Sequence, residues 1–175
     1  KVRARTKANR IWKIKDESGV SQEDAAEIER IFQSNFTYLF SSCHPEAADI
    51  SVALTGLRDR LSDHSKTMLT VPFTKLEVWE ALKQMNPLSA PGPDGFPPLF
   101  YQHYWDLVGT DTTAAILDWL NHENSVHISN HTHIALIPKV ADPQTPKDFR
   151  PISLCNVSYK IGAKMIANRM KPLMN

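Results

Sequence analysis

The segments His131-Thr-His-Ile-Ala-Leu-Ile-Pro-Lys139 and Phe149-Arg-Pro-Ile-Ser-Leu154 decide the fold that this 175-residue sequence predicts. Both segments alternate with the two-residue period of a β-strand, and Pro and Asp bound them. Residues 141–148, which lie between them, are rich in Pro and Asp and lack apolar periodicity. We therefore expect an antiparallel hairpin whose strands are joined by an exposed loop and not by a helix.

Two cations flank this loop, because Lys139 leaves the first predicted strand and Arg150 enters the second. Closing the hairpin brings them to the same end. Pro151 has no N–H to donate, so we expect the second strand to begin at an edge or near a gap in the sheet. A planar guanidinium and a compact ammonium on a stiff strand suit a polyphosphate. Their spacing alone leaves a second interpretation open, namely two solvated surface charges.

Upstream of the hairpin the sequence predicts mainly helices. A helix-start signal at Ser21 and Asp24, followed by apolar residues with a 3.6-residue period, predicts a helix over 22–40. Thr74 and Glu77 form a predicted capping box for a helix over 74–85. The remaining predictions are a loop over 43–51, a linker with a short helix over 54–69, an aromatic helix over 99–107 that packs in the core, and a helix from Thr110 or Asp111 to about Asn121.

Two further segments are candidates for nucleic-acid contact. The paired Pro and Gly residues of the loop 89–95 predict tight turns, with Gly92 and Gly95 free to adopt positive φ. An ordinary turn between two helices is the alternative there. After the hairpin, Asn156 begins a predicted helix with an apolar face that runs to Met170. On its wheel three lysines form one basic stripe, for which a solvated face is the alternative: Lys160, Lys164 and Lys171.

Charge is distributed unevenly along the chain, although the net charge is only +1. Residues 1–15 hold seven Lys or Arg and no acid, residues 139–175 carry +5, and the residues between carry −11. Basic ends around an acidic helical body suggest nucleic-acid contact at the ends. A nuclear-localisation signal and a solvated arm are the alternatives for the N-terminal segment.

Cysteine, histidine and apolar content exclude several classes of protein. Cys43 and Cys155 lie far apart without a CxxC pair, which predicts free thiols in a reducing compartment, the nucleus or the cytoplasm. No apolar run is long enough to span a bilayer and no N-terminal signal is seen, so we expect no membrane partner. A zinc site at His131 and His133 is conceivable, but the sequence indicates no third or fourth ligand and we predict none.

The motifs together resemble a known family. The blocks Ile134–Lys139, Phe149–Leu154 and Ala90-Pro-Gly-Pro-Asp-Gly-Phe96 are similar to the first motifs of reverse transcriptases from non-LTR retrotransposons, in particular the LINE-type elements of plants. The resemblance extends through 156–172 and, upstream, through 9–11 and 31–40. It implies an α+β fold, in which a basic arm and helical extension over 1–60 precede the polymerase fingers over 61–175, as part of an incomplete right-hand polymerase fold. Lys1 in place of Met and the periodic segment that ends at Asn175 lead us to expect cut ends, with the palm and thumb of the same polypeptide missing.

The family also implies roles for particular residues. The matches to Lys139 and Arg150 hold the triphosphate of an incoming deoxynucleotide. The loop that contains Gly92 and Gly95 lies near the template, and so does the helix that carries the three lysines. Ser89 departs from the family, which commonly has Lys at this position. The implied partners are an RNA template, a DNA primer and a deoxynucleoside triphosphate.

The implied catalysis needs carboxylates that hold two Mg²⁺ ions. The family supplies them from a palm Asp and an aromatic-x-Asp-Asp turn. This sequence contains no Asp-Asp pair and no acidic residue after Asp148. We therefore expect no catalytic residue, no metal and no cofactor in this part, and no polymerisation by it alone. Two alternatives remain: a truncated retrotransposon remnant that acts at most as an RNA-binding module, and a small helical interaction domain that matches by chance.

Overall fold

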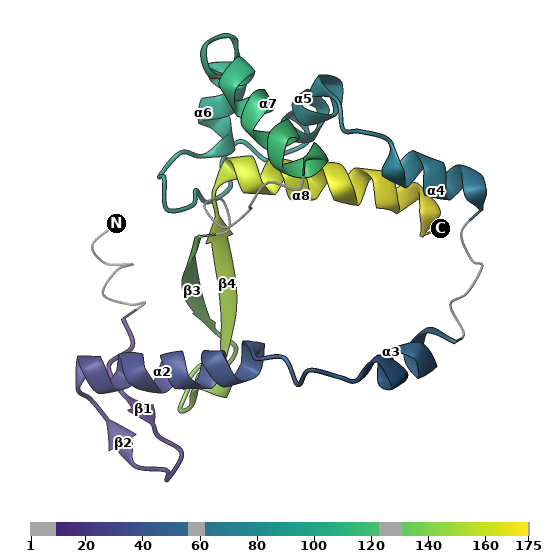
Figure 1. The fold of residues 1–175 in the computed structure, drawn as a ribbon. Coiled ribbons are helices and arrows are strands. Elements are labelled where there is room, and N and C mark those ends of the chain that lie inside the picture. The colour runs from purple at the N-terminus through teal and green to yellow at the C-terminus, as the bar shows by residue number, and fades with distance from the viewer. Residues whose placement is uncertain (1–9, 56–61, 123–130, 175) are drawn as a thin grey trace. The chain divides into compact units, whose positions relative to one another are not determined.

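A computed structural model describes residues 10–55, 62–122 and 131–174. The protein is α+β, as predicted, with helices and two small antiparallel hairpins. By its internal contacts it divides into two compact units. The N-terminal unit comprises residues 1–56 and 135–152, and the helical unit comprises 57–134 and 153–175. The elements, drawn in Figure 1, are β1 (Ile14–Lys15), β2 (Ser21–Gln22), α2 (Ala25–Phe40), α3 (Ala47–Leu54), α4 (Asp63–Thr70), α5 (Lys75–Lys83), α6 (Pro98–His103), α7 (Trp105–Asn121), β3 (Thr132–Pro138), η2 (Pro146–Asp148), β4 (Phe149–Cys155), α8 (Val157–Met170) and η3 (Lys171–Leu173).

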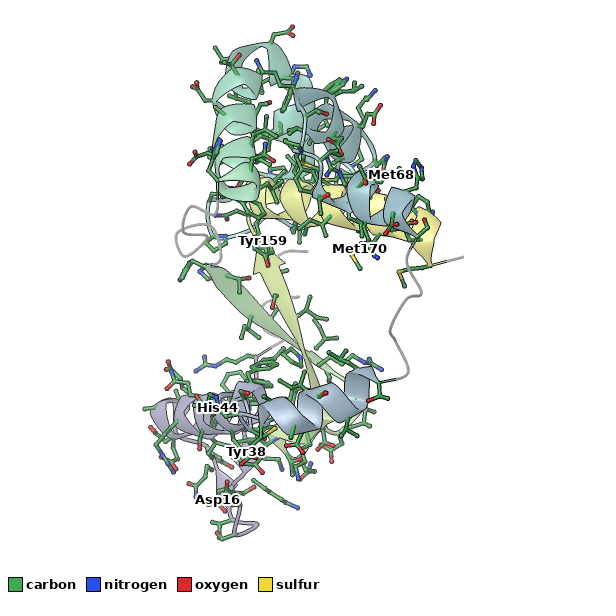
Figure 2. The ribbon with its side chains drawn as sticks, turned by 45° about the vertical axis from the view of Figure 1, so that its right-hand side comes forward. Asp16, Tyr38, His44, Met68, Tyr159 and Met170 are labelled. Atoms are coloured by element: carbon green, nitrogen blue, oxygen red, sulfur yellow. The ribbon has the colours of Figure 1, made fainter. Side chains whose placement is uncertain are left out.

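The N-terminal unit begins with the hairpin β1–β2, in which Ile14 pairs with Gln22. Asp16, labelled in Figure 2, organises the turn: its carboxylate accepts bonds from the N–H groups of Ser18 and Val20, each at 3.0 Å. Gly19 has a φ of 83°, a conformation that side chains disfavour. Together these features close the turn between the two strands.

Helix α2 begins at Ala25, so the prediction that a helix starts at Gln22 is wrong by three residues. The reason is that Gln22 pairs in β2, which leaves Asp24 as the N-cap, with its carboxylate accepting from the N–H of Glu27 at 3.0 Å. The apolar face of α2 supplies most of the core of this unit. That core consists of Ile14, Ile28, Ile31, Phe32 and Phe149.

Helix α3 lies partly where a loop was predicted over 43–51. Its N-cap Glu46 and Asp49 form a reciprocal capping box, and the alanines that follow favour a helix. The loop prediction was wrong here because Pro45 precedes the helix and does not interrupt it. No residue of α3 is buried.

In the helical unit, α8 packs beneath α5 and α7 (Figure 1). The predicted capping box at Thr74 and Glu77 is present and begins α5. The predicted apolar face of α8 is buried near its start and middle, whereas Ile166 and Met170 are 40% and 46% exposed. The core is made of Val78, Ala81, Leu82, Ile116, Val157, Ile161 and Met165.

Helix α7 starts at Trp105, and the prediction of a start at Thr110 or Asp111 is wrong. Gly109 lies inside the helix because the indole of Trp105 packs against it, and a Cβ there would lie 2.7 Å from Trp105 Cε2. The aromatic segment is core only in part: Tyr101 and Trp105 pack against the buried cluster, while Tyr104 is 48% exposed.

Strands β3 and β4 pair in a two-stranded sheet at the positions predicted from alternation. The loop between them differs from the prediction, because η2 forms one 3₁₀ turn where no helix was expected. Asp148 stabilises that turn: its carboxylate accepts from the N–H and the hydroxyl of Thr145 at 2.8 and 3.0 Å. Pro146 is buried. The loop is thus a folded structure.

Candidate nucleic-acid interface

The end of the β3–β4 hairpin carries the two predicted nucleotide-binding cations. The N–H of Lys139 donates to the carbonyl of Asp148 at 2.7 Å, two residues before Arg150, so the strands close beside both cations as predicted. The ammonium of Lys139 donates to the carbonyl of Lys147 at 2.6 Å. Arg150 is exposed, and its guanidinium has no hydrogen-bond or ion-pair partner in the part of the chain that the structure describes. Of the two cations, Arg150 is the more available to an anion.

Packing beneath the hairpin end holds it in place. Phe149, next to Arg150, is 4% exposed, and its ring meets Phe32 edge to face with centroids 5.3 Å apart. Because side chains alternate along a strand, burying Phe149 directs Arg150 away from this core. Hydrogen bonds from the N–H groups of Thr145 and Gln144 and from the Thr145 hydroxyl lower the pKa of Asp148. The loop beside the cations therefore keeps an ionised, bonded carboxylate.

A contact between β1 and this loop was not foreseen from the sequence. The N–H of Lys15 donates to the carbonyl of Gln144 at 2.8 Å. Lys13 and Lys15 therefore belong to the same unit as Lys139 and Arg150. The sequence did carry a local signal that this segment is half-buried, namely apolar residues interspersed with lysines. Ile11 and Ile14 pack on the core, while Lys13 and Lys15 are exposed. The partner of that strand was not readable from spacing.

A second group of predicted residues meets at the start of α8. Lys160 Nζ donates to the carbonyl of Ala90 at 2.7 Å, and the Asn156 carboxamide oxygen accepts from the N–H of Asp94 at 3.2 Å. Asn156 is the N-cap residue, as predicted, but its side chain bonds to the loop and makes no cap hydrogen bond. The structure therefore brings Lys160 and the Gly92 loop together. These bonds connect the loop to the start of α8.

The two glycines of the loop serve different purposes. Gly95 has a φ of 76°, as predicted. Gly92 does not have positive φ, and this part of the prediction is wrong. Gly92 is needed for close approach, because a Cβ there would overlap Asn156 and lie 2.5 Å from the backbone carbon of Cys155.

The other two lysines of the predicted stripe lie further along. Lys164 is half-buried on α8. Lys171 is exposed but begins η3, since α8 ends at Met170. The predicted continuous stripe on one α-helix therefore comprises Lys160 and Lys164, with Lys171 just beyond it.

Arg169, which lies off that stripe, forms a clamp that sequence reasoning missed. Its Nε and Nη2 donate to the Glu77 carboxylate at 2.6 and 3.0 Å. Nη1 donates to the carbonyl of Val71, and Nη2 donates to the carbonyl of Pro72 as well. The Arg169 Cζ lies 3.7 Å from the Phe73 ring centroid. Burial raises the pKa of Glu77, but the hydrogen bonds from Arg169 and Thr74 outweigh it, so the pKa lies below its ordinary value.

No group of three His, Cys, Asp or Glu residues suited to a metal ion occurs within residues 10–55, 62–122 and 131–174. The His131 and His133 rings lie 6.0 Å apart, and both Cys43 and Cys155 are free. In the same described ranges no helix has the length and apolar character needed to cross a membrane.

One pocket, of about 440 Å³, lies between α5 and α7. Trp79 and Trp105, stacked with centroids 5.2 Å apart, line it together with Lys75 and Asp106. None of the site residues predicted from the sequence lines this pocket. The candidate interface therefore consists of surface cations and loops.

Comparison with known proteins places the chain in a broad class. No model of a known protein family matches it. Over 158 residues, 90% of this chain, the sequence is 30% identical to a Xenopus laevis protein described as Transposon TX1 uncharacterized 149 kDa protein. The chain is thus related to a transposon protein. This supports the predicted relationship to transposon-encoded proteins. It spans about 12% of the length of that relative.

Proposed function

We propose that this chain is the fingers part of an RNA-directed DNA polymerase of a non-LTR retrotransposon, which positions template RNA and the incoming nucleotide and is not catalytic by itself. The observation that carries the proposal is the similarity to a transposon protein over 90% of the chain. The ordered motif blocks supply the polymerase assignment. The folded hairpin end with Arg150 exposed is compatible with a contact to triphosphate.

In this proposal Arg150 and Lys139 bind the triphosphate. The loop with Gly92 and Gly95 and the lysines Lys160, Lys164 and Lys171 approach the template; because the Lys160 ammonium is bonded to Ala90, its contribution is mainly to hold the loop. Mg²⁺ and the catalytic carboxylates belong to the palm of the complete polymerase. RNA template, DNA primer and deoxynucleoside triphosphate are the proposed partners.

The test is made in the complete polymerase that carries this sequence. Each charge-assisted contact to the triphosphate contributes about 1.5 to 3 kcal/mol. Arg150→Ala should therefore raise the KM for deoxynucleotide by about one to two orders of magnitude. Lys147→Ala is the matched control, because its exposed ammonium lies in the same loop while only its carbonyl bonds to Lys139. An unchanged KM and kcat for Arg150→Ala would refute the assignment.

The alternative is a retrotransposon remnant with at most an RNA-binding role. Both candidates predict RNA binding, so a binding assay does not distinguish the remnant from the polymerase part. Sequencing the transcript beyond the codon for Asn175 decides between them. A frame that continues into a catalytic Asp and an aromatic-x-Asp-Asp turn supports the polymerase. A stop codon there supports the remnant. Primer extension by the purified 175-residue chain, free of contaminating polymerase, would contradict both.

A further inference from the structure

Trp12 is an exposed tryptophan at the start of the N-terminal unit. It leaves 56% of its surface exposed, whereas Trp79, Trp105 and Trp119 pack against the core of the helical unit. Its neighbours explain the exposure: Ile11 packs on the core of the N-terminal unit and Ile14 is 1% exposed within it. The segment is therefore anchored through Ile11 and Ile14, and the Trp12 indole is left on the surface.

The surroundings of Trp12 are basic. Arg10 Cζ lies 4.3 Å from the centroid of the indole, a cation–π contact. Lys13 and Lys15 are exposed on the same segment, and residues 1–15 contain no acid. The first acid, Asp16, has its carboxylate engaged by the β1–β2 turn. An exposed ring flanked by cations is the arrangement that single-stranded nucleic acids bind, because bases stack on the ring and phosphates meet the charges.

We propose that Trp12, with Arg10 and Lys13, is a stacking platform for an unpaired base of single-stranded nucleic acid. Arg10 occupies one side of the indole, and the base takes the remaining exposed ring surface while Arg10 and Lys13 meet the flanking phosphates. Every base has a π-face, so the contact tolerates any sequence. The inference goes beyond the proposed function, because it requires neither Lys139 and Arg150 nor a polymerase.

The experiment measures binding of a fluorescently labelled 12-nucleotide oligo(U) to the full 175-residue chain by anisotropy. Trp12→Ala should weaken binding about tenfold, and Trp12→Phe should stay within about threefold of the wild type. Tyr38→Ala is the matched control, because Tyr38 (Figure 2) is an aromatic of the same unit that is 85% exposed. It should leave the affinity unchanged. Lys13→Ala should lower the slope of log affinity against log salt by about 0.7, and Trp12→Ala should not.

Further variants separate stacking from a general loss of structure. Trp12→Leu retains apolar bulk without a π-face and should bind as weakly as Trp12→Ala, while the thermal midpoints of all three Trp12 variants stay close to that of the wild type. Oligo(U) should quench tryptophan emission in the wild type and much less in Trp12→Phe. Wild-type affinity in Trp12→Leu or Trp12→Ala would overturn the proposal, as would an equal loss in Tyr38→Ala or an equal effect on a blunt duplex. These outcomes are independent of the KM of an Arg150 variant, so this proposal and the proposed function can fail separately.

Discussion

The clamp formed by Arg169 offers the sharpest test of what stabilises the helical unit. The guanidinium side chain is 10% exposed and its partner Glu77 is 27% exposed. Replacing Arg169 by Ala leaves the Glu77 carboxylate and the carbonyls of Val71 and Pro72 without these donors. Removing one partner of a buried pair costs about 3–5 kcal/mol. Because Glu77 is partly solvated and keeps its bonds from Thr74, we expect about 3 kcal/mol.

That loss should lower the thermal midpoint by about 6–12 °C, at about 2–4 °C per kcal/mol for a chain of this size. Tryptophan fluorescence reports mainly on unfolding of the helical unit, because three of the four tryptophans lie in it: Trp79, Trp105 and Trp119. Arg30→Ala is the control, since its pair with Glu27 is a solvent-exposed pair within one helix, and such pairs contribute little to stability. Equal midpoints for Arg169→Ala and Arg30→Ala would refute the reasoning.

The same clamp predicts a dependence on pH. The folded-state pKa of Glu77 lies below the ordinary value of 4.5, so its contribution is present above that value and is lost as pH falls through the folded pKa. The difference in midpoint between wild type and Arg169→Ala should therefore narrow below about pH 4.5. A difference that stays constant down to pH 2 would show that the Glu77 charge is not involved.

Three shorter predictions concern the loops. Gly92→Ala should destabilise the helical unit by about 1–3 kcal/mol in urea unfolding, because the added Cβ overlaps Asn156; wild-type stability would contradict the close approach. Lys160→Met should speed amide hydrogen exchange in the loop after Ala90, whose carbonyl loses its donor; unchanged exchange would show that this bond does not order the loop. Hydrogen bonds from Ser18, Gln22 and Val20 lower the pKa of Asp16 to about 2, so its contribution to stability is present above its ordinary value of 3.8 and disappears as pH falls toward 2; an NMR titration midpoint near 3.8 would contradict the turn geometry.

Local chemistry made much of the fold predictable. The capping box at Thr74 and the strands β3 and β4 depend on residues within one element, and the structure confirms them. Burial along β3 does not alternate, however, since Ile134 and Ile137 are both 45% exposed. The errors arose where an element's role depends on contacts elsewhere. Gln22 pairs in a hairpin instead of extending a helix, and Gly109 accommodates the Trp105 indole inside α7, which begins before the predicted Thr110 or Asp111.

In the candidate site, too, contacts within one hairpin were predictable and contacts between distant residues were not. The position of Lys139 beside the strand that carries Arg150 followed from the hairpin pattern. The bonds from Lys160 to Ala90 and from Arg169 to Glu77 join residues 70 and 92 positions apart, and no spacing rule links such pairs. The family resemblance located the loop but not the lysine that ties it down. Whether Lys139 and Arg150 bind nucleotide stays a prediction.

The participation of Phe149 in the core of the N-terminal unit has a consequence during synthesis. Its partner Phe32 leaves the ribosome about 120 residues earlier. At translation rates of about 5–20 residues per second, the apolar face of α2 waits roughly 6–25 s for its last aromatic neighbour. During that interval the nascent chain exposes part of the apolar face of α2, and such transiently exposed apolar surface promotes aggregation.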